Sequence, residues 1–436
     1  MVVAAEIWLW DMLAGAVLWD EAEQMGSFEF NPNFFSSGLD ISPVKMPLSQ
    51  GNRIYRFPEL LKSRGDVFDT FKGLPGLLAD MLPDKYGNQL INAWLIQNGR
   101  AADSLNPVEQ LCFIGKRGVG ALEIRPSLRA ETIQASSLEI DSLVDIAGKI
   151  LNSREGFQSN LTGEEQSALS DILKIGTSAG GARAKAVIAY NPKTGKVKSG
   201  QVKAPAGFSY WIIKFDGVHD SQFGATVGYG KVEMAYYRMA LAAGVEMSEC
   251  RLLEENGRAH FMTKRFDRKG NGQKIHMQSL CGLRHFDFNR VGEYSYEQVF
   301  ETMRMLRLSY PEAEQMFIRM VFNVLARNCD DHTKNFAFLM DQNGKWVLSP
   351  AYDICYAYRP GSLWVSAQSL MVNGKRDNIT GNDFLEVARK MNIKKPEEKI
   401  EQIKSAVCRW REFADEVGVN AALRDDISDT LLVSCQ

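Results

Sequence analysis

Asp330, Asn335 and Asp353 are the side chains in this sequence whose types and spacing are best suited to chemistry. Phosphoryl transfer from ATP needs a carboxylate that orients the attacking hydroxyl group. It also needs a second carboxylate and an amide oxygen that can hold Mg²⁺ on the phosphates. We therefore interpret Asp330 as a catalytic base, and Asn335 with Asp353 as ligands of Mg²⁺.

The spacing within the polar stretch supports this interpretation. Asn335 follows Asp330 by five positions, which is the separation of the base Asp and the metal-binding Asn in kinase catalytic loops. His332 completes an Asp-x-His-x-x-Asn pattern that is also found in lipid and antibiotic kinases, and we include it with Lys334 among the catalytic candidates. A solvated loop with helix-capping Asp and Asn residues would have the same composition, so the surrounding elements must decide.

Two elements must position these side chains. Apolar residues at helical spacing predict an amphipathic helix that ends just before Asp330. Residues 336–340 and 346–348 are typical of two strands, and residues 341–344 are typical of the turn between them. This hairpin would return the chain so that Asp353 lies near Asp330. The apolar face of the helix consists of Met316, Phe317, Met320, Val321, Val324 and Leu325.

Residues 176–185 form a second candidate site, a loop rich in Gly, Ala and Ser between two predicted strands. Small side chains let backbone N–H groups approach an anion, so this loop could cover the phosphates of ATP. An ordinary hairpin loop has the same composition. The nucleotide contacts predicted here are Ala179, Gly180, Gly181, Ala182, Arg183 and Lys185.

A lysine and a glutamate follow in the order that kinases use. Lys214 closes an apolar strand, and Glu233 lies in the first turn of the next predicted helix. In kinases this Lys meets the phosphates of ATP and pairs with the Glu. The alternative is a lysine at a sheet edge and a glutamate that complements a helix dipole. A later strand leads into a predicted hinge, where Lys264 and Phe266 are candidate nucleotide contacts.

Composition limits the partners and the compartment. The chain has 436 residues, of which 45% are hydrophobic, so we expect two or three domains with substantial cores. Its net charge of −2 gives no global positive field that would attract nucleic acid. The seven Cys residues form no Cys-x-x-Cys pair, which suits a reducing compartment. We find no signal peptide and no uncharged apolar run of about 18 residues, and we expect a cytoplasmic protein without membrane contact.

The chain divides into three predicted regions. Residues 1–130 are interpreted as a mixed, mostly β subdomain. Residues 131–270 are interpreted as a kinase N-lobe that contains the Gly-rich loop. Residues 271–436 are interpreted as a helical C-lobe that carries the catalytic and metal-binding segments.

Local patterns give sharper expectations at both ends of the chain. Residues 7–10 and 16–19 flank a Gly-containing turn and predict a hairpin. Residues 113–115 and 121–124 predict a second hairpin in the same way. A single long final helix is expected to begin at Pro396.

Five segments together resemble the HipA family, bacterial serine/threonine kinases that act as toxins in toxin–antitoxin pairs. An N-terminal signature, the Gly-rich loop, the hinge and the two acidic segments occur in the family's order, and the similarity runs nearly end to end. The resemblance implies an α+β, protein-kinase-like two-lobe fold with an N-terminal, mostly β subdomain and an all-helical C-lobe. The five segments are residues 71–91, 176–186, 264–268, 328–338 and 348–353.

The resemblance also implies roles and partners. MgATP would be the cofactor, with Lys214 on the phosphates and Lys334 placed to neutralise charge in the transition state. Ser178 matches a loop serine that such kinases autophosphorylate, which ejects the loop and inactivates the enzyme, and Thr177 beside it is the alternative. The family's protein substrates include aminoacyl-tRNA synthetases. The usual partner is a helix-turn-helix antitoxin of the HipB type, through which the kinase reaches DNA only indirectly.

Two other functions would use the same residues. A small-molecule phosphotransferase shares the Asp-x-His-x-x-Asn chemistry. A catalytically silent pseudokinase would bind a repressor partner through its surface. Every expected catalytic position is filled, which argues against the pseudokinase.

Overall fold

Helices and sheets of the chain are distributed over two units. The structure, a computed structural model, describes residues 3–63, 68–126, 140–152, 172, 183–200, 203–218, 227–269 and 272–434. The first unit comprises Met1–Ser42, Met46–Gly230 and Arg251–Met277, and the second comprises Pro43–Lys45, Lys231–Cys250 and Gln278–Gln436.

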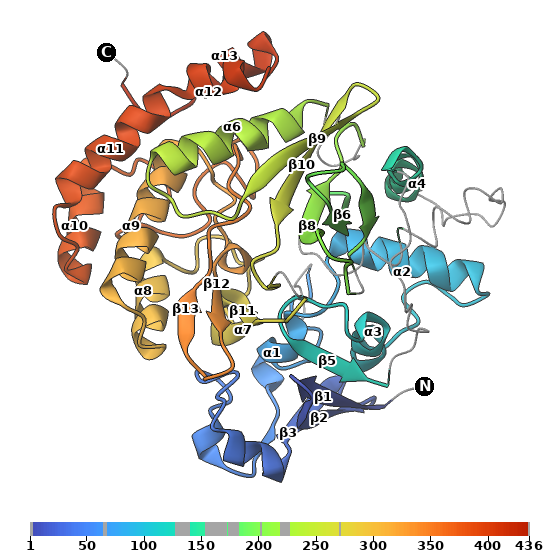
Figure 1. The fold of residues 1–436 in the computed structure, drawn as a ribbon. Helices are drawn as coiled ribbons and strands as arrows, with labels where there is room; N and C mark the ends of the chain where they lie inside the picture. The colour runs from blue at the N-terminus through green and yellow to red at the C-terminus, as the bar shows by residue number, and fades with distance from the viewer. Residues whose placement is uncertain are drawn as a thin grey trace. The chain divides into compact units, whose positions relative to one another are not determined.

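The first unit contains an N-terminal antiparallel sheet. Its strands are β1 (Ala4–Leu9), β2 (Met12–Asp20), β3 (Met25–Phe30), β4 (Ile54–Tyr55) and β5 (Leu122–Arg125), in the spatial order β4-β3-β2-β1-β5 (Figure 1). Ile7, Leu9 and Val17 are fully buried and alternate with more exposed residues, as a sheet with one face on a core requires. The pairing of β1 with β2 confirms the first predicted hairpin.

A second sheet of the first unit carries the two candidate lysines. Lys185 begins β6 and Lys214 ends β8, and the two residues are direct partners in the antiparallel register. Lys214 is also the partner of Phe261 on the next strand. The strands are β6 (Lys185–Tyr190), β7 (Val197–Ser199), β8 (Ser209–Lys214), β9 (Cys250–Glu255) and β10 (Arg258–Lys264), in the order β7-β6-β8-β10-β9.

The second predicted hairpin is wrong. Phe113 and Ile114 are the last two residues of a helix, α3 (Pro107–Ile114), and β5 pairs with β1 instead. The helix begins at a capping box in which the Asn106 side chain accepts from the Glu109 N–H and the Glu109 side chain accepts from the Asn106 N–H. Pro107 at the first helical position favours the same start. The other helical elements of this unit are η1 (Pro32–Ser37), η2 (Leu48–Gln50), η3 (Pro58–Leu60), α1 (Gly76–Ala79), α2 (Lys85–Gln97) and α4 (Ile140–Asn152).

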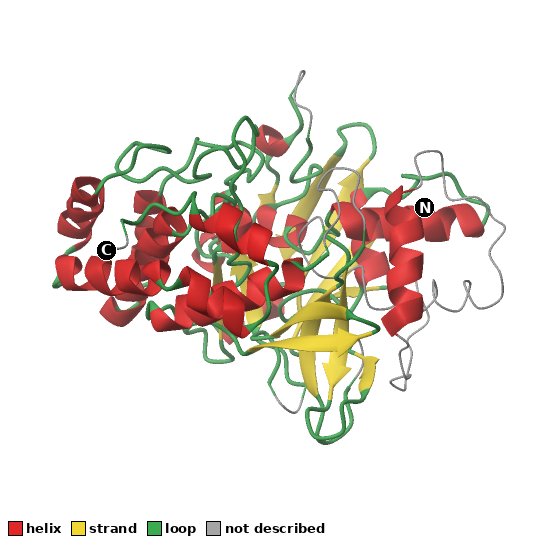
Figure 2. Ribbon diagram, turned by 90° about the horizontal axis from the view of Figure 1, so that it is seen from above, coloured by secondary structure: helices red, strands yellow, loops and turns green. Residues whose placement is uncertain are grey.

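The second unit is mainly helical, and its one sheet is β11-β12-β13 among the residues that the structure describes. The strands are β11 (His276–Ser279), in which the chain passes from one unit to the other, β12 (Ala337–Met340) and β13 (Trp346–Leu348). Figure 2 shows the helices gathered around the C-terminus. The helical elements are α6 (Tyr229–Ala242), α7 (Leu280–Arg284), α8 (Tyr296–Met305), α9 (Tyr310–Leu325), η4 (Thr333–Asn335), α10 (Gly381–Met391), α11 (Pro396–Cys408), α12 (Trp410–Glu416) and α13 (Ala421–Ser428).

Helix α9 lies at the centre of the second unit, where it contacts α8, α10 and α11. Its predicted apolar face is buried. The prediction of a single long final helix is wrong, because the chain leaves helical geometry at Arg409 and continues as α12. Trp410 is buried there, and its indole N–H donates to the Arg424 carbonyl at 2.9 Å, a contact that the local sequence pattern does not contain.

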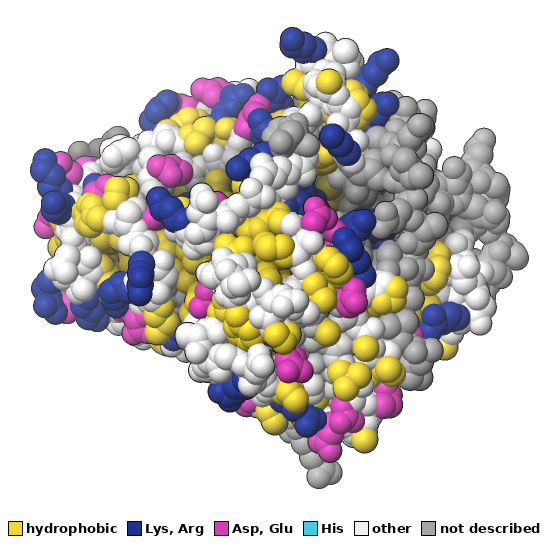
Figure 3. Space-filling model, turned by 60° about the horizontal axis from the view of Figure 1, so that its bottom comes forward, with side chains coloured by type: hydrophobic (Ala, Val, Ile, Leu, Met, Phe, Trp, Pro, Cys, Tyr) yellow, Lys and Arg dark blue, Asp and Glu magenta, His cyan; other side chains and the backbone are white. Residues whose placement is uncertain are grey.

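Most of the first two predicted regions lies in the first unit, but residues 43–45 and 231–250 belong to the second. The predicted boundary near residue 270 falls close to residue 277, where the chain enters the second unit for the last time. The three-region division stays a prediction. Basic and acidic side chains are interspersed on the face drawn in Figure 3, in keeping with the net charge of −2.

Candidate active site

The acidic loop begins where α9 ends. Leu325 is the last residue of the helix, and Arg327 takes a left-handed φ of 53°, which turns the chain away from the helix axis. The loop closes with the single turn of η4 and continues directly into β12. The predicted helix and hairpin therefore bracket the loop, as the sequence indicates.

Asn335 closes this loop onto Asp330. Its side-chain Nδ2 donates to the Asp330 carbonyl at 2.8 Å, and its backbone N–H donates to the His332 carbonyl at 2.9 Å. Because the amide nitrogen makes this bond, the Oδ1 atom of Asn335 is left to accept from, or ligate, another group. The five-residue spacing thus has a direct structural basis.

The three predicted catalytic side chains lie on this one loop. Asp330 is 49% exposed, and its Oδ1 lies 3.8 Å from Nε2 of His332. The ring of Phe288 lies beside both other candidates, with 5.3 Å between the Phe288 and His332 centroids and 4.7 Å from the Lys334 ammonium to the Phe288 centroid. A cation over an aromatic face is held in place without an ion pair.

Asp353 reaches the same recess as Asn335. The Tyr352 hydroxyl donates to the Lys334 carbonyl at 2.6 Å and so ties the segment after the hairpin to the acidic loop. Asp353 has a φ of 56°, a left-handed conformation that Asp tolerates better than most residues. Asn335, Asp353 and Asp331 are among the residues that line this recess.

The donor set fits a magnesium ion held partly by substrate. Asn335 offers an amide oxygen and Asp353 a carboxylate, the oxygen ligands that Mg²⁺ prefers. In the part of the chain that the structure describes, no three His, Cys, Asp or Glu side chains gather into a metal site. A Mg²⁺ ion would therefore need phosphate and water oxygens for its remaining positions, as nucleotide-bound Mg²⁺ does.

The structure describes only the end of the Gly-rich loop, from Arg183 onward. The predicted contacts at Ala179, Gly180, Gly181 and Ala182, and the predicted phosphorylation site at Ser178 or Thr177, lie outside the described residues. Arg183 is described, and its guanidinium carbon lies 4.4 Å from the Tyr229 ring centroid.

Lys185 has a partner that the sequence did not reveal. Its ammonium forms an ion pair at 2.7 Å with Asp84, and the Lys185 side chain is 3% exposed. Asp84 also caps α2, since its Oδ1 accepts from the Gly87 N–H at 2.7 Å. This buried pair gives Lys185 a structural role, and its contact with a nucleotide stays a prediction.

Lys214 belongs to the first unit and Glu233 to the second. The Lys214 ammonium lies 5.7 Å from the Phe261 ring centroid, at the end of β8. Glu233 is buried in α6, but the predicted first-turn position is wrong, because the helix begins at Tyr229 and its first turn contains no acidic residue. Their pairing with each other stays a prediction.

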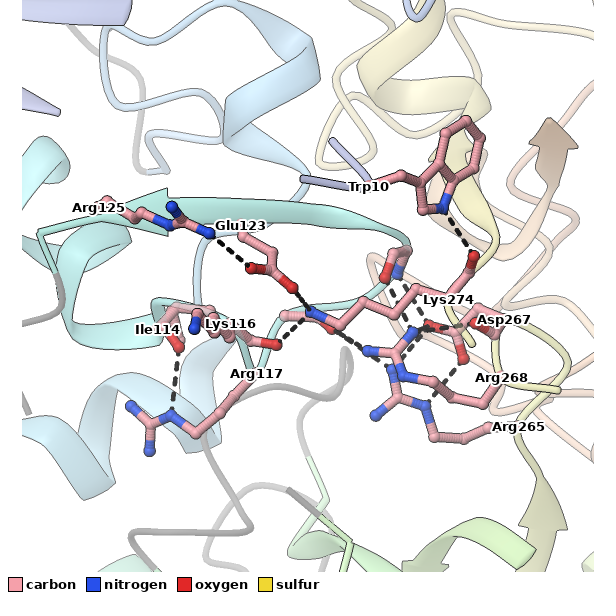
Figure 4. Close-up of polar contacts among 12 residues, drawn as sticks. Trp10, Ile114, Lys116, Arg117, Glu123, Arg125, Arg265, Asp267, Arg268 and Lys274 are labelled. Carbon is pink, nitrogen blue, oxygen red and sulfur yellow. Dashed lines mark hydrogen bonds and ion pairs between the residues drawn. The ribbon is translucent and has the colours of Figure 1, made fainter. Parts of the chain in front are cut away.

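The predicted hinge is fixed by a buried charge cluster, which we call the Asp267 cluster: Glu123, Arg265, Asp267, Arg268 and Lys274 (Figure 4). Asp267 accepts from Arg265 Nε at 2.8 Å and Nη2 at 2.6 Å, and from Arg268 Nη1 at 2.8 Å. Lys274 pairs with Glu123 at 2.9 Å.

Asp267 also accepts from the Gly120 N–H at 2.8 Å, so the cluster joins the hinge to the loop before β5. The two candidate nucleotide contacts, Lys264 and Phe266, flank Arg265 of this cluster. Lys264 is exposed, with its ammonium 6.0 Å from the Trp211 centroid, and Phe266 is half-buried.

Asp331 is the residue of the acidic loop whose role sequence reasoning missed. It is fully buried and accepts from the Tyr296 hydroxyl at 2.7 Å, the Ser369 N–H at 2.7 Å and the Gln368 amide at 3.0 Å. Burial raises the pKa of Asp331 to about 6. Two adjacent Asp residues give no signal in the sequence that says which one faces inward.

Residues 5–125 match the family model described as the HipA N-terminal domain, and residues 177–412 match the HipA-like C-terminal domain. The chain belongs to the HipA family. This confirms the family that the five segments indicated.

A solved HipA shares the fold. HipA of Shewanella oneidensis MR-1, from a complex with HipB and operator DNA, aligns with 98% of this chain and 96% of that chain at 16% identity, with a TM-score of 0.68. The predicted kinase-like α+β fold is confirmed. The Helicobacter pylori proinflammatory kinase CtkA aligns with 58% of this chain and 90% of that chain at 13% identity, with a TM-score of only 0.35.

A curated relative covers a smaller part of this HipA-family chain. The putative kinase Y4mE of Sinorhizobium fredii is 27% identical over 157 residues, which is 34% of this chain and 36% of that protein. The match thus spans about a third of the relative's length. Among the described helices, none is long and apolar enough to cross a membrane.

Proposed function

We propose that this HipA-family protein is an ATP-dependent serine/threonine-protein kinase. The observation that carries the proposal is the closed acidic loop, in which Asn335 Nδ2 bonds the Asp330 carbonyl while Tyr352 ties the Asp353 segment to the same loop. Base, amide oxygen and second carboxylate are thereby gathered in one unit. The relative Y4mE, whose name is putative kinase, supports the same chemistry.

Each side chain has a distinct task in this proposal. Asp330, half-exposed on its loop, accepts the proton of the attacking hydroxyl and orients it toward the γ-phosphorus of ATP. Asn335 and Asp353 would hold Mg²⁺, which when bound supplies positive charge beside the transferring phosphoryl group. Lys334 and Lys214 stabilise negative charge on the phosphates, and His332 shapes the loop beside Phe288.

The proposal extends to regulation and partners. Autophosphorylation at Ser178, or at Thr177, would add negative charge to the Gly-rich loop and inactivate the enzyme. The likeness to a HipA taken from a complex with HipB and DNA supports a toxin role, with a DNA-binding antitoxin of the HipB type as partner. A bacterial protein such as an aminoacyl-tRNA synthetase is the proposed substrate.

Substitution Asp330→Asn tests the catalytic assignment. We expect ATP binding, measured by thermal shift with MgATP, to remain, and transfer of radiolabelled γ-phosphate to fall on the order of 10²- to 10⁴-fold, because a general base is lost. Asp341→Asn is the matched control, since Asp341 sits in the turn of the β12–β13 hairpin and keeps its acceptor oxygen there. Undiminished labelling by the Asp330 variant would refute the base.

Two further measurements separate the proposal from its alternatives. Intact-protein mass spectrometry after incubation with MgATP, followed by peptide mapping, should find one added phosphate at Ser178. Labelling of a metabolite panel in place of protein would support a small-molecule phosphotransferase. A MgATP thermal shift without any turnover would support a pseudokinase.

A further inference from the structure

Asp331 stands next to the proposed base and has the opposite orientation. Asp330 is half-exposed, whereas Asp331 is 1% exposed and has hydrogen-bond donors on both of its carboxylate oxygens. Its Oδ1 accepts from the Ser369 N–H, and its Oδ2 accepts from the Tyr296 hydroxyl and the Gln368 amide. A buried carboxylate with this many short bonds fixes the backbone that carries it.

The segment after the hairpin is bound to the loop around Asp331. Gln368 Nε2 donates to the Asn328 carbonyl at 3.1 Å, and Ser369 Oγ donates to the Cys329 carbonyl at 3.0 Å. The Cys329 thiol donates to Gln368 Oε1 at 3.0 Å. Residues 368–369 therefore make hydrogen bonds to Asn328, Cys329 and Asp331 of the loop.

Two helices complete the network. Tyr296, the first residue of α8, is fully buried, and its hydroxyl accepts from Asn323 Nδ2 of α9 at 2.9 Å. Asn328 Nδ2 in turn donates to Asn323 Oδ1 at 2.9 Å. The end of α9, the start of α8 and the acidic loop thus share one chain of neutral donors that terminates on the Asp331 carboxylate.

Asp330 directly precedes Asp331, and the Asp330 carbonyl accepts from Asn335 Nδ2 at 2.8 Å. The position of the base therefore depends on where this loop backbone is held, because the backbone carries its side chain. We propose that Asp331 is a positioning residue for phosphoryl transfer, which sets the base through the Tyr296 and 368–369 contacts. This inference rests on the proposed kinase function and deepens it.

Substitution Asp331→Asn tests this role with little change in shape. An asparagine would present an NH₂ group to the Gln368 amide, which is also a donor, so at least one bond is lost. We expect kcat to fall about 100-fold, the effect of a small misplacement of a reacting group, while KM for ATP changes less than about twofold. The measurement is steady-state transfer to a hydroxyl-bearing peptide or protein, at varied ATP.

A matched control separates positioning from general loss of stability. Asp383 is another buried carboxylate of the same unit, and it accepts from Thr380 N–H and hydroxyl and from Lys375. It is the acidic member of the capping box at the start of α10. Asp383→Asn should lower the melting temperature at least as much as Asp331→Asn, yet leave kcat within about twofold of the wild type.

Tyr296→Phe is the milder second variant. It removes one hydroxyl from the network, so we expect a fall in kcat of about threefold to tenfold, the equivalent of one hydrogen bond, again without a change in KM for ATP. Wild-type kcat in both Asp331→Asn and Tyr296→Phe would overturn the inference alone. No turnover in the wild-type chain would overturn the proposed function, and the inference with it.

Discussion

Asp267 in the first unit and Asp331 in the second are both buried aspartates, at 3% and 1% exposure, in opposite surroundings. Burial disfavours the charge of Asp267, but Arg265 and Arg268 outweigh it and hold the pKa of Asp267 well below its usual value. Asp331 has neutral donors only, Tyr296, Gln368 and backbone N–H groups, so burial prevails and raises its pKa to about 6.

The difference separates two uses of a buried carboxylate. Asp267 has a structural use. Its guanidinium partners stabilise the charged carboxylate, which in turn accepts from the Gly120 N–H and so holds the hinge to the loop before β5. Asp331 is held by donors that cannot neutralise it, so its ionised form costs stability. A costly buried charge beside a candidate site is more often there for function than for stability.

The largest effect expected is that of Asp267→Ala. It leaves two guanidinium groups buried without their carboxylate, and we expect the free energy of unfolding to fall by about 3–5 kcal/mol. Urea denaturation measures this change. Arg56→Ala is the control, because its pair with Asp20 spans 3.8 Å with both side chains 41% exposed, and we expect a loss below about 1 kcal/mol. Equal losses would show that burial of the pair does not matter.

The pH dependence of stability should distinguish the two aspartates. The pKa of Asp331 is raised from 3.8 to about 6 in the folded state. The stabilisation of the fold by protonated Asp331 is therefore complete below about pH 4 and is lost as the pH rises through about 6. Asp331→Asn lacks this loss, and its stability relative to the wild type should improve between pH 4 and 7 by up to roughly 3 kcal/mol.

Asp267→Asn should behave differently over the same range. The pKa of Asp267 is lowered, so its stabilising contribution is present above about pH 4 and is lost only as the pH falls further. The deficit of this variant should therefore stay constant from pH 4.5 to 7. Denaturation midpoints at several pH values measure both series, and parallel slopes for the two variants would contradict the comparison.

The smallest effect that we expect concerns two buried tyrosines, of which one donates to Asp331. Tyr296→Phe removes a hydroxyl that donates to a carboxylate, and we expect a loss of about 1.5–3 kcal/mol. Tyr86→Phe should be neutral or slightly stabilising, since the buried Tyr86 hydroxyl has no hydrogen-bond partner among the described residues. Thermal denaturation of the two variants measures this, and a larger loss for Tyr86→Phe would contradict it.

Elements whose signals are local could be predicted well. The helical spacing of apolar residues from Met316 to Leu325 predicted α9 and its buried face. The pattern at 113–115 failed because a capping box at Asn106 and Glu109 extends a helix into it. Periodicity alone does not separate a short buried strand from the end of a helix.

The candidate site divides in the same way. The sequence by itself determined that the Asn335 side chain lies beside Asp330. A separation of five residues lets the Asn335 amide reach the Asp330 carbonyl in one local hydrogen bond. Only the tertiary structure decided that Asp331 faces inward, that Lys185 pairs with Asp84, and that Asp267 meets Gly120 across 147 residues. Burial and ion pairing depend on which distant segments pack together, and a local pattern of residue types does not contain that information.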